Sequence, residues 1–211
     1  MMYSAVCGNF IFVTVREALP SVLSVLRKLY LQNRAPGRLL QLIKGAANKK
    51  LLNAALFQLG WFACVLGGDA IAFVVTATIL CIHQLFVVNK RFEWSLIAIV
   101  AVTGFVVDSS LAHFGVFSFK SSSLFYIPFW LFCLWVLFAT TLNHSLEWLK
   151  NWLWLAVILG GFFGPMSYFA GSRLADVALS SPPLLSMVYI SLCWAVLLPA
   201  FYLYIRFREV Q

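Results

Sequence analysis

The sequence predicts an all-α membrane protein: a bundle of six transmembrane helices, with both ends cytoplasmic, preceded by a basic arm. Three observations lead to this fold class. Of the 211 residues, 63% are hydrophobic and only 10% are charged, whereas soluble domains are about 45–50% apolar and about 25% charged. Six apolar runs each approach the roughly 20 residues that a helix needs to cross the hydrocarbon core. The basic residues are also divided unevenly between the connections.

The first element is an arm, residues 1–47. Apolar side chains in "ALPSVLSVLRKLYLQ" recur at spacings of three and four residues from Leu19 to Tyr30, with Arg27 and Lys28 off that face. Such a pattern is typical of a helix lying on a membrane surface. Six of the fifteen basic residues precede residue 48, so we expect an anionic lipid surface as the partner, and no nucleic acid. The arm is therefore predicted to be an amphipathic helix or disordered.

The second element is the transmembrane domain, residues 48–211. Its spans are expected at about residues 51–67, 70–88, 94–116, 124–142, 152–171 and 184–205. All should be helical, because unpaired backbone groups cannot face lipid. A cytoplasmic amino terminus places thirteen of the fifteen Lys and Arg residues inside and leaves only Lys120 and Arg173 outside. This imbalance is a strong positive-inside signal.

Polar side chains inside the spans raise functional hypotheses, because ionisable groups are costly at membrane depth. On the second span Asp69, Thr76 and His83 recur every seven residues, and Lys90 continues this stripe. A candidate polar pocket in the cytoplasmic half comprises Asn53, Gln58, His83, Gln84, Asn143 and His144. Ordinary interhelical hydrogen bonds, worth about 0.6 kcal/mol on average, explain the same residues and are our preferred interpretation.

A second polar cluster is expected in the periplasmic half. It comprises Asp69, Asp108, His113, Tyr168 and Arg173. Asp108 lies deep in the third span, so it should face the bundle interior and bind a polar group on another helix. Arg173 is the first candidate partner and Tyr168 the second. His113 is rotated by about 140° from Asp108 on a helix, so these two cannot form a same-face pair.

The fifth span carries a face of small residues that is typical of close helix packing. These residues are Gly160, Gly164, Ser167 and Gly171. Pro165 removes the hydrogen bond to the Gly161 carbonyl and should kink the helix, which frees that carbonyl for another partner. Packing between helices is the expected role of this face.

Several catalytic signatures are absent from the sequence. The five cysteines are scattered, with no CxxC or Cys/His pairing at metal-site spacing. There is no HExxH, GxSxG, P-loop or dinucleotide fingerprint. Because the chain has only three histidines, a histidine-rich di-metal centre is not expected. We predict no metal and no cofactor.

Four blocks of sequence, in this order, resemble an uncharacterised bacterial inner-membrane family, domain of unknown function 2878, over about residues 50–205. They are "LLNAALFQLGWFACVLGG", "DSSL" at 108–111, "FWLFCLWVLFATTLNHSLEWL" at 129–149 and "GGFFGPMSYFAGSRL" at 160–174. The resemblance implies a compact helical bundle in the bacterial inner membrane with no established activity. It also implies a genetic neighbourhood of enzymes that modify membrane fatty acids. It supplies no catalytic residue.

Three functions stay open at this point, and whether the protein is an enzyme is uncertain. The first is an accessory protein or enzyme in membrane lipid or fatty-acyl modification, with membrane lipid as its partner. The second is a small-solute transporter or channel, which requires the polar stripe to line a continuous cavity. The third is a non-catalytic scaffold for other membrane proteins. We rank the lipid-related function first.

Overall fold

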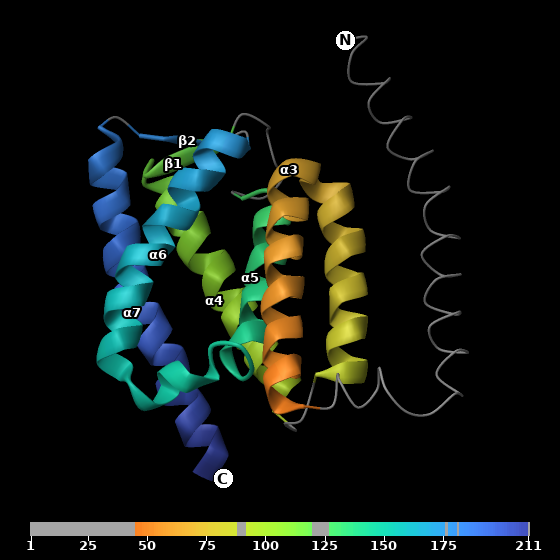
Figure 1. The fold of residues 1–211 in the computed structure, drawn as a ribbon. Helices are drawn as coiled ribbons and strands as arrows, with labels where there is room; N and C mark the ends of the chain where they lie inside the picture. Colours follow the sequence, from red (N-terminus) through yellow and green to blue (C-terminus); the bar gives the residue numbers. More distant parts are fainter. Residues whose placement is uncertain (1–44, 88–91, 120–126, 176, 181, 211) are drawn as a thin grey trace. The chain divides into compact units, whose positions relative to one another are not determined.

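The computed structural model describes residues 45–87, 92–119, 127–175, 177–180 and 182–210. Apart from its last three residues, the arm predicted over residues 1–47 lies outside them. The described helices are α3 (Ala46–Phe86), α4 (Glu93–His113), α5 (Phe129–Leu142), the short 3-10 helix η1 (Glu147–Asn151), α6 (Leu153–Leu174) and α7 (Pro183–Val210). Two short strands, β1 (Phe117–Phe119) and β2 (Val177–Leu179), complete the described elements (Figure 1).

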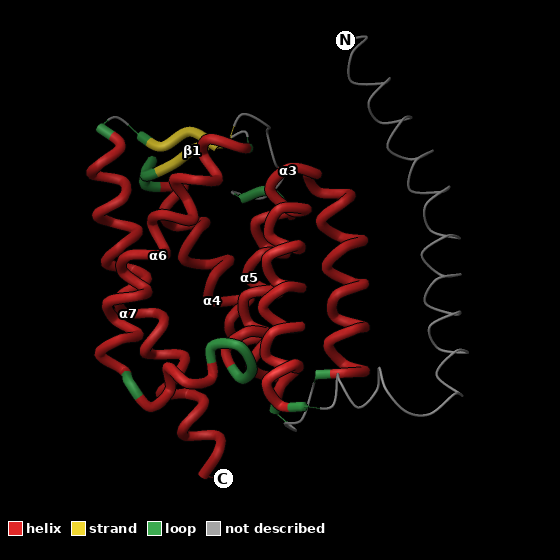
Figure 2. The backbone as a smooth tube through the Cα atoms, viewed as in Figure 1, coloured by secondary structure: helices red, strands yellow, loops and turns green. Residues whose placement is uncertain are grey.

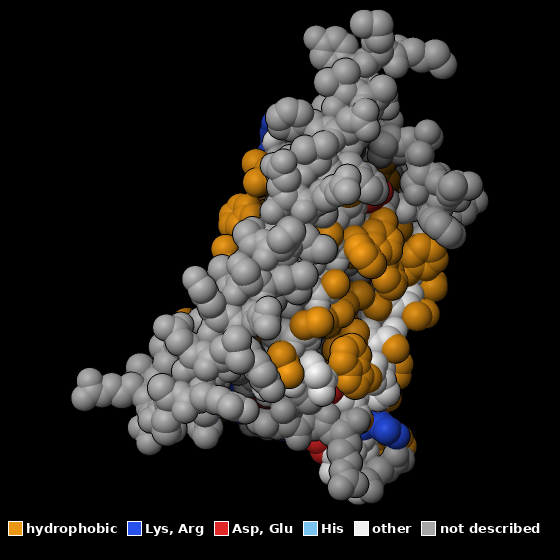
Figure 3. All heavy atoms as spheres, turned by 90° about the vertical axis from the view of Figure 1, so that its right-hand side faces the viewer, with side chains coloured by type: hydrophobic (Ala, Val, Ile, Leu, Met, Phe, Trp, Pro, Cys, Tyr) orange, Lys and Arg blue, Asp and Glu red, His pale blue; other side chains and the backbone are white. Residues whose placement is uncertain are grey.

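Four of the described helices, α3, α4, α6 and α7, are long and apolar enough to cross a membrane. Their outer faces expose large hydrophobic side chains, such as Leu85 at 75% and Val196 at 68%. The described side chains on the face shown in Figure 3 are also mainly hydrophobic. Monomeric soluble proteins rarely expose contiguous apolar surface on this scale. These helices therefore indicate a membrane protein.

Helix α3 folds back on itself at Gly68. This residue has φ 68° and ψ −171°, a backbone conformation that glycine adopts without the steric cost other residues incur. The two halves of α3 run in opposite directions (Figure 1), and Cys64 Sγ in the first half lies 4.0 Å from Thr76 Oγ1 in the second. The break falls between the spans expected at about residues 51–67 and 70–88.

Helix α4 ends earlier than the span predicted over residues 94–116. Gly115, with φ 72°, donates to the Ala112 carbonyl, and Val116 donates to the Leu111 carbonyl. These two bonds form a Schellman motif, which ends a helix where glycine takes the left-handed conformation. The prediction was wrong here because it followed hydrophobicity through residues 114–116 and ignored this glycine.

The two strands were not predicted. Phe117 pairs with Leu179 and Phe119 with Val177 in an antiparallel ladder, drawn in yellow in Figure 2. Both strands lie in segments assigned to connections or span ends, and the described spans themselves are helical, as expected. The ladder satisfies backbone groups at this end of the bundle, which we call the strand end.

Helix α5 is central to the packing, because it lies against both α3 and α4. Its 14 residues are fewer than the roughly 20 that span the hydrocarbon core. Trp135 of α5 stacks on Trp194 of α7, with ring centres 4.9 Å apart. On the α3 side, Cys133 and Leu137 pack with Ile79. Both faces of this helix therefore belong to the core.

Gly160 and Gly164 of the small-residue face of α6 pack against α7, as expected, whereas a Cβ added to Gly171 would meet nothing within 4 Å. A Cβ added to Gly164 would lie 2.3 Å from Trp194 Cγ, and one added to Gly160 would lie 2.6 Å from the Trp194 carbonyl oxygen. The Gly161 carbonyl, which Pro165 leaves without its helical donor, accepts a hydrogen bond of 2.7 Å from Ser191 Oγ. The glycines thus allow the two helices to approach closely.

Charged side chains gather around η1, at the opposite end from the strands, which we call the η1 end. Lys150 Nζ lies 3.2 Å from Glu209 and 3.4 Å from Glu147, while Lys50 Nζ lies 3.3 Å from Glu147. Partial burial acts to lower the pKa of Lys150, but the Glu209 and Glu147 carboxylates outweigh it and raise this pKa. Such a concentration of partly exposed charge is expected at a membrane–water interface.

Candidate functional site

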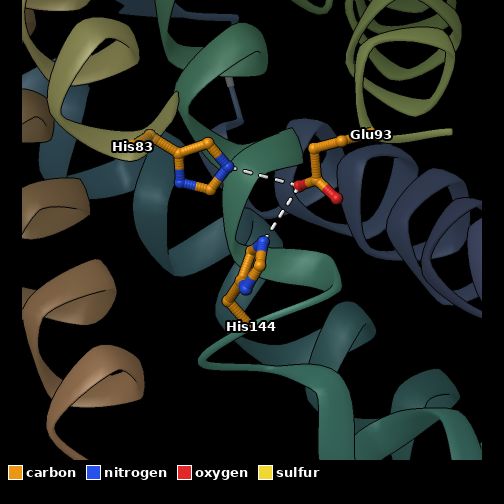
Figure 4. A group of neighbouring side chains, drawn as sticks. All are labelled: His83, Glu93 and His144. Atoms are coloured by element: carbon orange, nitrogen blue, oxygen red, sulfur yellow. Dashed lines mark hydrogen bonds and ion pairs between the residues drawn. The ribbon is translucent and has the colours of Figure 1, made fainter. Parts of the chain in front are cut away.

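Three helical segments meet at a buried carboxylate near the η1 end. Glu93 begins α4, His83 lies near the end of α3, and Asn143 and His144 follow α5 directly. Glu93 Oε1 lies 3.3 Å from His83 Nε2 and 3.2 Å from His144 Nε2, as Figure 4 shows. Asn143 Nδ2 donates to Glu93 Oε2 at 3.0 Å. These four residues form what we call the Glu93 centre.

Burial makes the Glu93 centre electrostatically unusual. Glu93 and His83 are each 1% exposed, Asn143 is 3% and His144 is 7%. A buried carboxylate is stable only when paired or hydrogen-bonded, and here three side chains and the positive end of the α4 dipole surround it. His83 Nδ1 and Asn143 Oδ1 have no hydrogen-bond partner among the described residues. The centre therefore holds a carboxylate and two imidazoles in a site with unsatisfied polar atoms.

The Glu93 centre contains the donor set of a metal site. His83, Glu93 and His144 each offer one ligand atom, and these atoms lie within 4.8 Å of one another. The sequence expectation of no metal rested on spacing along the chain and on the presence of only three histidines. Glu93 is separated from the two histidines by 10 and 51 residues, so the spacing gives no sign of this group.

Asn53, another member of the predicted pocket, has a structural role beside this centre. Its Nδ2 donates to the Thr140 carbonyl of α5 at 3.0 Å, and its Oδ1 accepts from Ser145 Oγ at 2.7 Å. The carbonyls of the last turn of a helix lack helical donors, so Asn53 caps α5 from α3. This contact agrees with the interpretation of the polar residues as interhelical hydrogen bonds.

The remaining two members of the predicted pocket, Gln58 and Gln84, are exposed and are not part of the Glu93 centre. Gln84 follows His83 directly and is rotated from it by about 100° on the helix. Gln58 is rotated by about 140° from Asn53. Similar depth in the membrane therefore did not imply a shared face. Glu93 was not among the predicted site residues, because it lies in the connection between the spans expected at about residues 70–88 and 94–116.

Asp108 is the centre of the second predicted cluster. It is fully buried and accepts hydrogen bonds from the Tyr168 hydroxyl at 2.5 Å and from Trp135 Nε1 at 2.7 Å. Tyr168 was the second expected partner, and this contact is present. The prediction that Arg173 pairs with Asp108 was wrong. The Arg173 guanidinium instead lies 5.1 Å from the centre of the Phe169 ring.

The other members of the second cluster lie elsewhere. Asp69 Oδ1 accepts a hydrogen bond of 2.9 Å from the Trp130 backbone nitrogen, so it satisfies an amide in the first turn of α5. His113 is exposed at the end of α4, and its ring lies against Phe114. The structure brings Asp108 and Tyr168 together and leaves Asp69, His113 and Arg173 outside this contact.

An apolar groove of about 800 Å³ opens between the first half of α3 and α6. Its lining includes Phe57 and Trp61 of α3, Phe163 of α6, Trp194 of α7 and Phe138 of α5. A smaller cavity of about 70 Å³ shares Phe57, Trp61, Phe138 and Trp194. We call the larger cavity the α3–α6 groove.

The α3–α6 groove carries few polar groups. Ser167 and Gln58 are its lining residues with a hydroxyl or amide side chain. Trp135 and Tyr168, which hold Asp108, line the adjoining small cavity. Thr76 and His83 of the predicted polar stripe line neither of these two cavities. The apolar groove therefore adjoins the residues that bind Asp108. The described residues of the predicted polar stripe do not line the groove.

Residues 50–200 match the family described as "Protein of unknown function (DUF2878)". No curated protein matches the chain, and no solved structure matches it.

Proposed function

Because this chain belongs to the family of proteins of unknown function DUF2878, which brings no activity with it, we propose a function from the α3–α6 groove. The protein binds the acyl chain of a membrane lipid there and serves as an accessory protein or enzyme in lipid or fatty-acyl modification. The observation that carries this proposal is a groove of about 800 Å³ with almost entirely apolar walls. Ligand sites typically have volumes of about 300–1,000 Å³.

The surroundings of the groove favour an acyl chain as its occupant. Phe62 and Phe163 at its edges are 45% and 61% exposed, and both lie on helices apolar enough to cross a membrane. The medium against such faces is lipid hydrocarbon, and no water competes for the groove. A lipid can therefore enter sideways from the bilayer without its chain meeting water.

Selectivity must come from packing and from the few polar groups. Lipid tails are as apolar as the groove walls, so the hydrophobic effect does not favour the groove over the bilayer. The aromatic rings of Trp61, Phe163 and Trp194 offer close dispersion contacts to methylene groups. Ser167 Oγ supplies a hydrogen-bonding group in the lining, where it meets a polar or unsaturated part of the chain.

We further propose a six-span topology in the bacterial inner membrane, in which the two halves of α3 and the short α5 count as separate spans. The folded-back α3 and the charges at the η1 end support this arrangement. Transport, the second function considered from the sequence, needs the polar stripe to line a cavity. Thr76 and His83 are instead 6% and 1% exposed and pack inside the protein, so no observation favours transport.

Photocrosslinking tests the acyl-chain proposal. The full-length protein is reconstituted in nanodiscs that contain a phosphatidylethanolamine with a diazirine in its acyl chain, and the labelled peptides are mapped after illumination. We expect label concentrated around Phe163 and Trp194, because these side chains line the groove. Label spread evenly over the lipid-facing helices contradicts the proposal.

A matched pair of variants makes the mapping specific. Ala170→Trp fills the groove, since Ala170 lines it, and should remove most label at Trp194. Val196→Trp places the same ring on the lipid-facing side of α7, where Val196 is 68% exposed, and should leave that label unchanged. Comparative lipidomics of a deletion strain carrying the native gene or either variant then reports whether acyl-chain composition depends on the groove.

A further inference from the structure

We propose that the Glu93 centre binds a divalent transition-metal ion, with zinc as the best match, through His83 Nε2, His144 Nε2 and Glu93 Oε1. Two imidazoles and one carboxylate form a ligand set used by catalytic zinc sites. Magnesium and calcium prefer oxygen ligands only. This inference is independent of the acyl-chain proposal, because none of the three residues lines the groove.

The distances, which also satisfy hydrogen bonds, fit ligands around a metal. Two ligand atoms that each lie about 2.0–2.1 Å from a tetrahedral zinc ion are separated by about 3.3–3.4 Å. The distances from Glu93 Oε1 to the two histidine nitrogens are 3.3 and 3.2 Å. Hydrogen bonds from a cationic nitrogen to a carboxylate are shorter, at about 2.7–2.9 Å. The ligand atoms all lie within 4.8 Å of one another, close enough to surround one ion.

The second support for the site is an unsatisfied oxygen beside it. Asn143 is 3% exposed, and its Oδ1 has no hydrogen-bond donor among the described residues. Buried polar atoms are normally satisfied, and an exception points to a bound water or ion. Zinc with three protein ligands usually carries a water in its fourth position, and a water is the kind of donor that this oxygen lacks.

Asn143 is also the positioning residue of the site. Its Nδ2 donates to Glu93 Oε2 at 3.0 Å, which leaves Glu93 Oε1 directed at the two histidines. Partners of this kind fix the orientation of a ligating side chain, and their removal typically weakens metal binding by about 10–100-fold. The metal would link the second half of α3, the start of α4 and the segment after α5.

Metal analysis of the full-length protein tests this proposal. The chain is purified in detergent with an affinity tag that contains no histidine, incubated with zinc and desalted, and its zinc is measured by mass spectrometry. We expect one zinc ion per chain in the wild type and in His113→Gln, which changes the exposed third histidine. Glu93→Gln, His83→Gln and His144→Gln should lose it. Asn143→Ala should bind about 10–100-fold more weakly.

Measurements on the wild type alone keep the proposal testable when a variant fails to fold. Zinc should raise the unfolding temperature of the chelator-treated protein, whereas magnesium should not, because binding to the folded state stabilises it. Cobalt should give the visible absorption of a tetrahedral nitrogen and oxygen site. A wild type that binds no zinc, or zinc that remains in Glu93→Gln at the wild-type amount, overturns the assignment.

Discussion

Replacing Asp108 by alanine removes the carboxylate that holds Trp135 and Tyr168 at the strand end of the bundle. The substitution removes two hydrogen bonds: one of 2.7 Å donated by Trp135 Nε1, and one of 2.5 Å donated by the Tyr168 hydroxyl. Interhelical hydrogen bonds in membrane proteins contribute about 0.6 kcal/mol on average and about 1.7 kcal/mol at most. Two such bonds therefore account for about 1.2–3.4 kcal/mol of the free energy of unfolding.

The stability of the single variant does not isolate these bonds. Asp108→Ala also removes the cost of burying a carboxylate, about 2.5–3.5 kcal/mol if the group is ionised at the centre of a membrane helix. The two effects have opposite sign and similar size. The informative quantity is therefore the coupling energy between Asp108 and Tyr168, in which the burial cost of Asp108 cancels.

A double-mutant cycle of Asp108→Ala and Tyr168→Phe measures this coupling through unfolding in detergent. We expect about 0.6–1.7 kcal/mol, with the double variant less damaged than the sum of the single ones. Tyr202→Phe is the matched control, because it removes a buried hydroxyl bonded to the Leu146 carbonyl and shares no partner with Asp108. That control cycle should be additive within about 0.3–0.5 kcal/mol. Additive losses for Asp108 and Tyr168 as well would refute the direct contact.

Two further predictions follow from the packing and from the proposed topology. Gly104→Ala should destabilise the protein by about 1–3 kcal/mol or more, because the new Cβ would lie 1.9 Å from Trp135 Cδ2. Gly171→Ala, whose Cβ meets nothing within 4 Å, should be neutral or slightly stabilising in the same unfolding assay, and equal losses would contradict this packing. A reporter active only in the periplasm should be active when fused after Gly68 and inactive after Gln211, and the reverse pattern would exclude the proposed orientation.

Hydrophobicity predicted the helices well where an apolar run ended at the helix end. The break in α3 at Gly68 falls between the two apolar runs expected at about residues 51–67 and 70–88. Where hydrophobicity continued past a helix end, as at Gly115, the prediction failed. The strands were missed because three-residue ladders depend on pairing Phe117 with Leu179, and neither strand shows a pattern of its own.

The polar sites show a different limit of prediction from the sequence. Depth in the membrane grouped His83, Asn143 and His144, which all contact Glu93 in the structure, because the sequence gives distance from a span end directly. Depth could not identify Glu93 as a site residue, although its side chain contacts residues on two other segments. Depth also could not exclude Arg173 as the partner of Asp108. Those contacts depend on how each helix is rotated and packed against its neighbours. An acid placed directly before an apolar span and flanked by Phe92 and Trp94 is the signal that should have drawn attention to Glu93.

Native mass spectrometry of the full-length protein tests the acyl-chain proposal most directly. The protein is released from detergent in the spectrometer, and the lipid that remains bound to each variant is weighed and identified. We predict a retained lipid in the wild type and in Val196→Trp, and its loss in Ala170→Trp, because only the last substitution fills the α3–α6 groove. A wild type that retains no lipid, or equal retention in all three proteins, would contradict the proposed binding of an acyl chain in this groove.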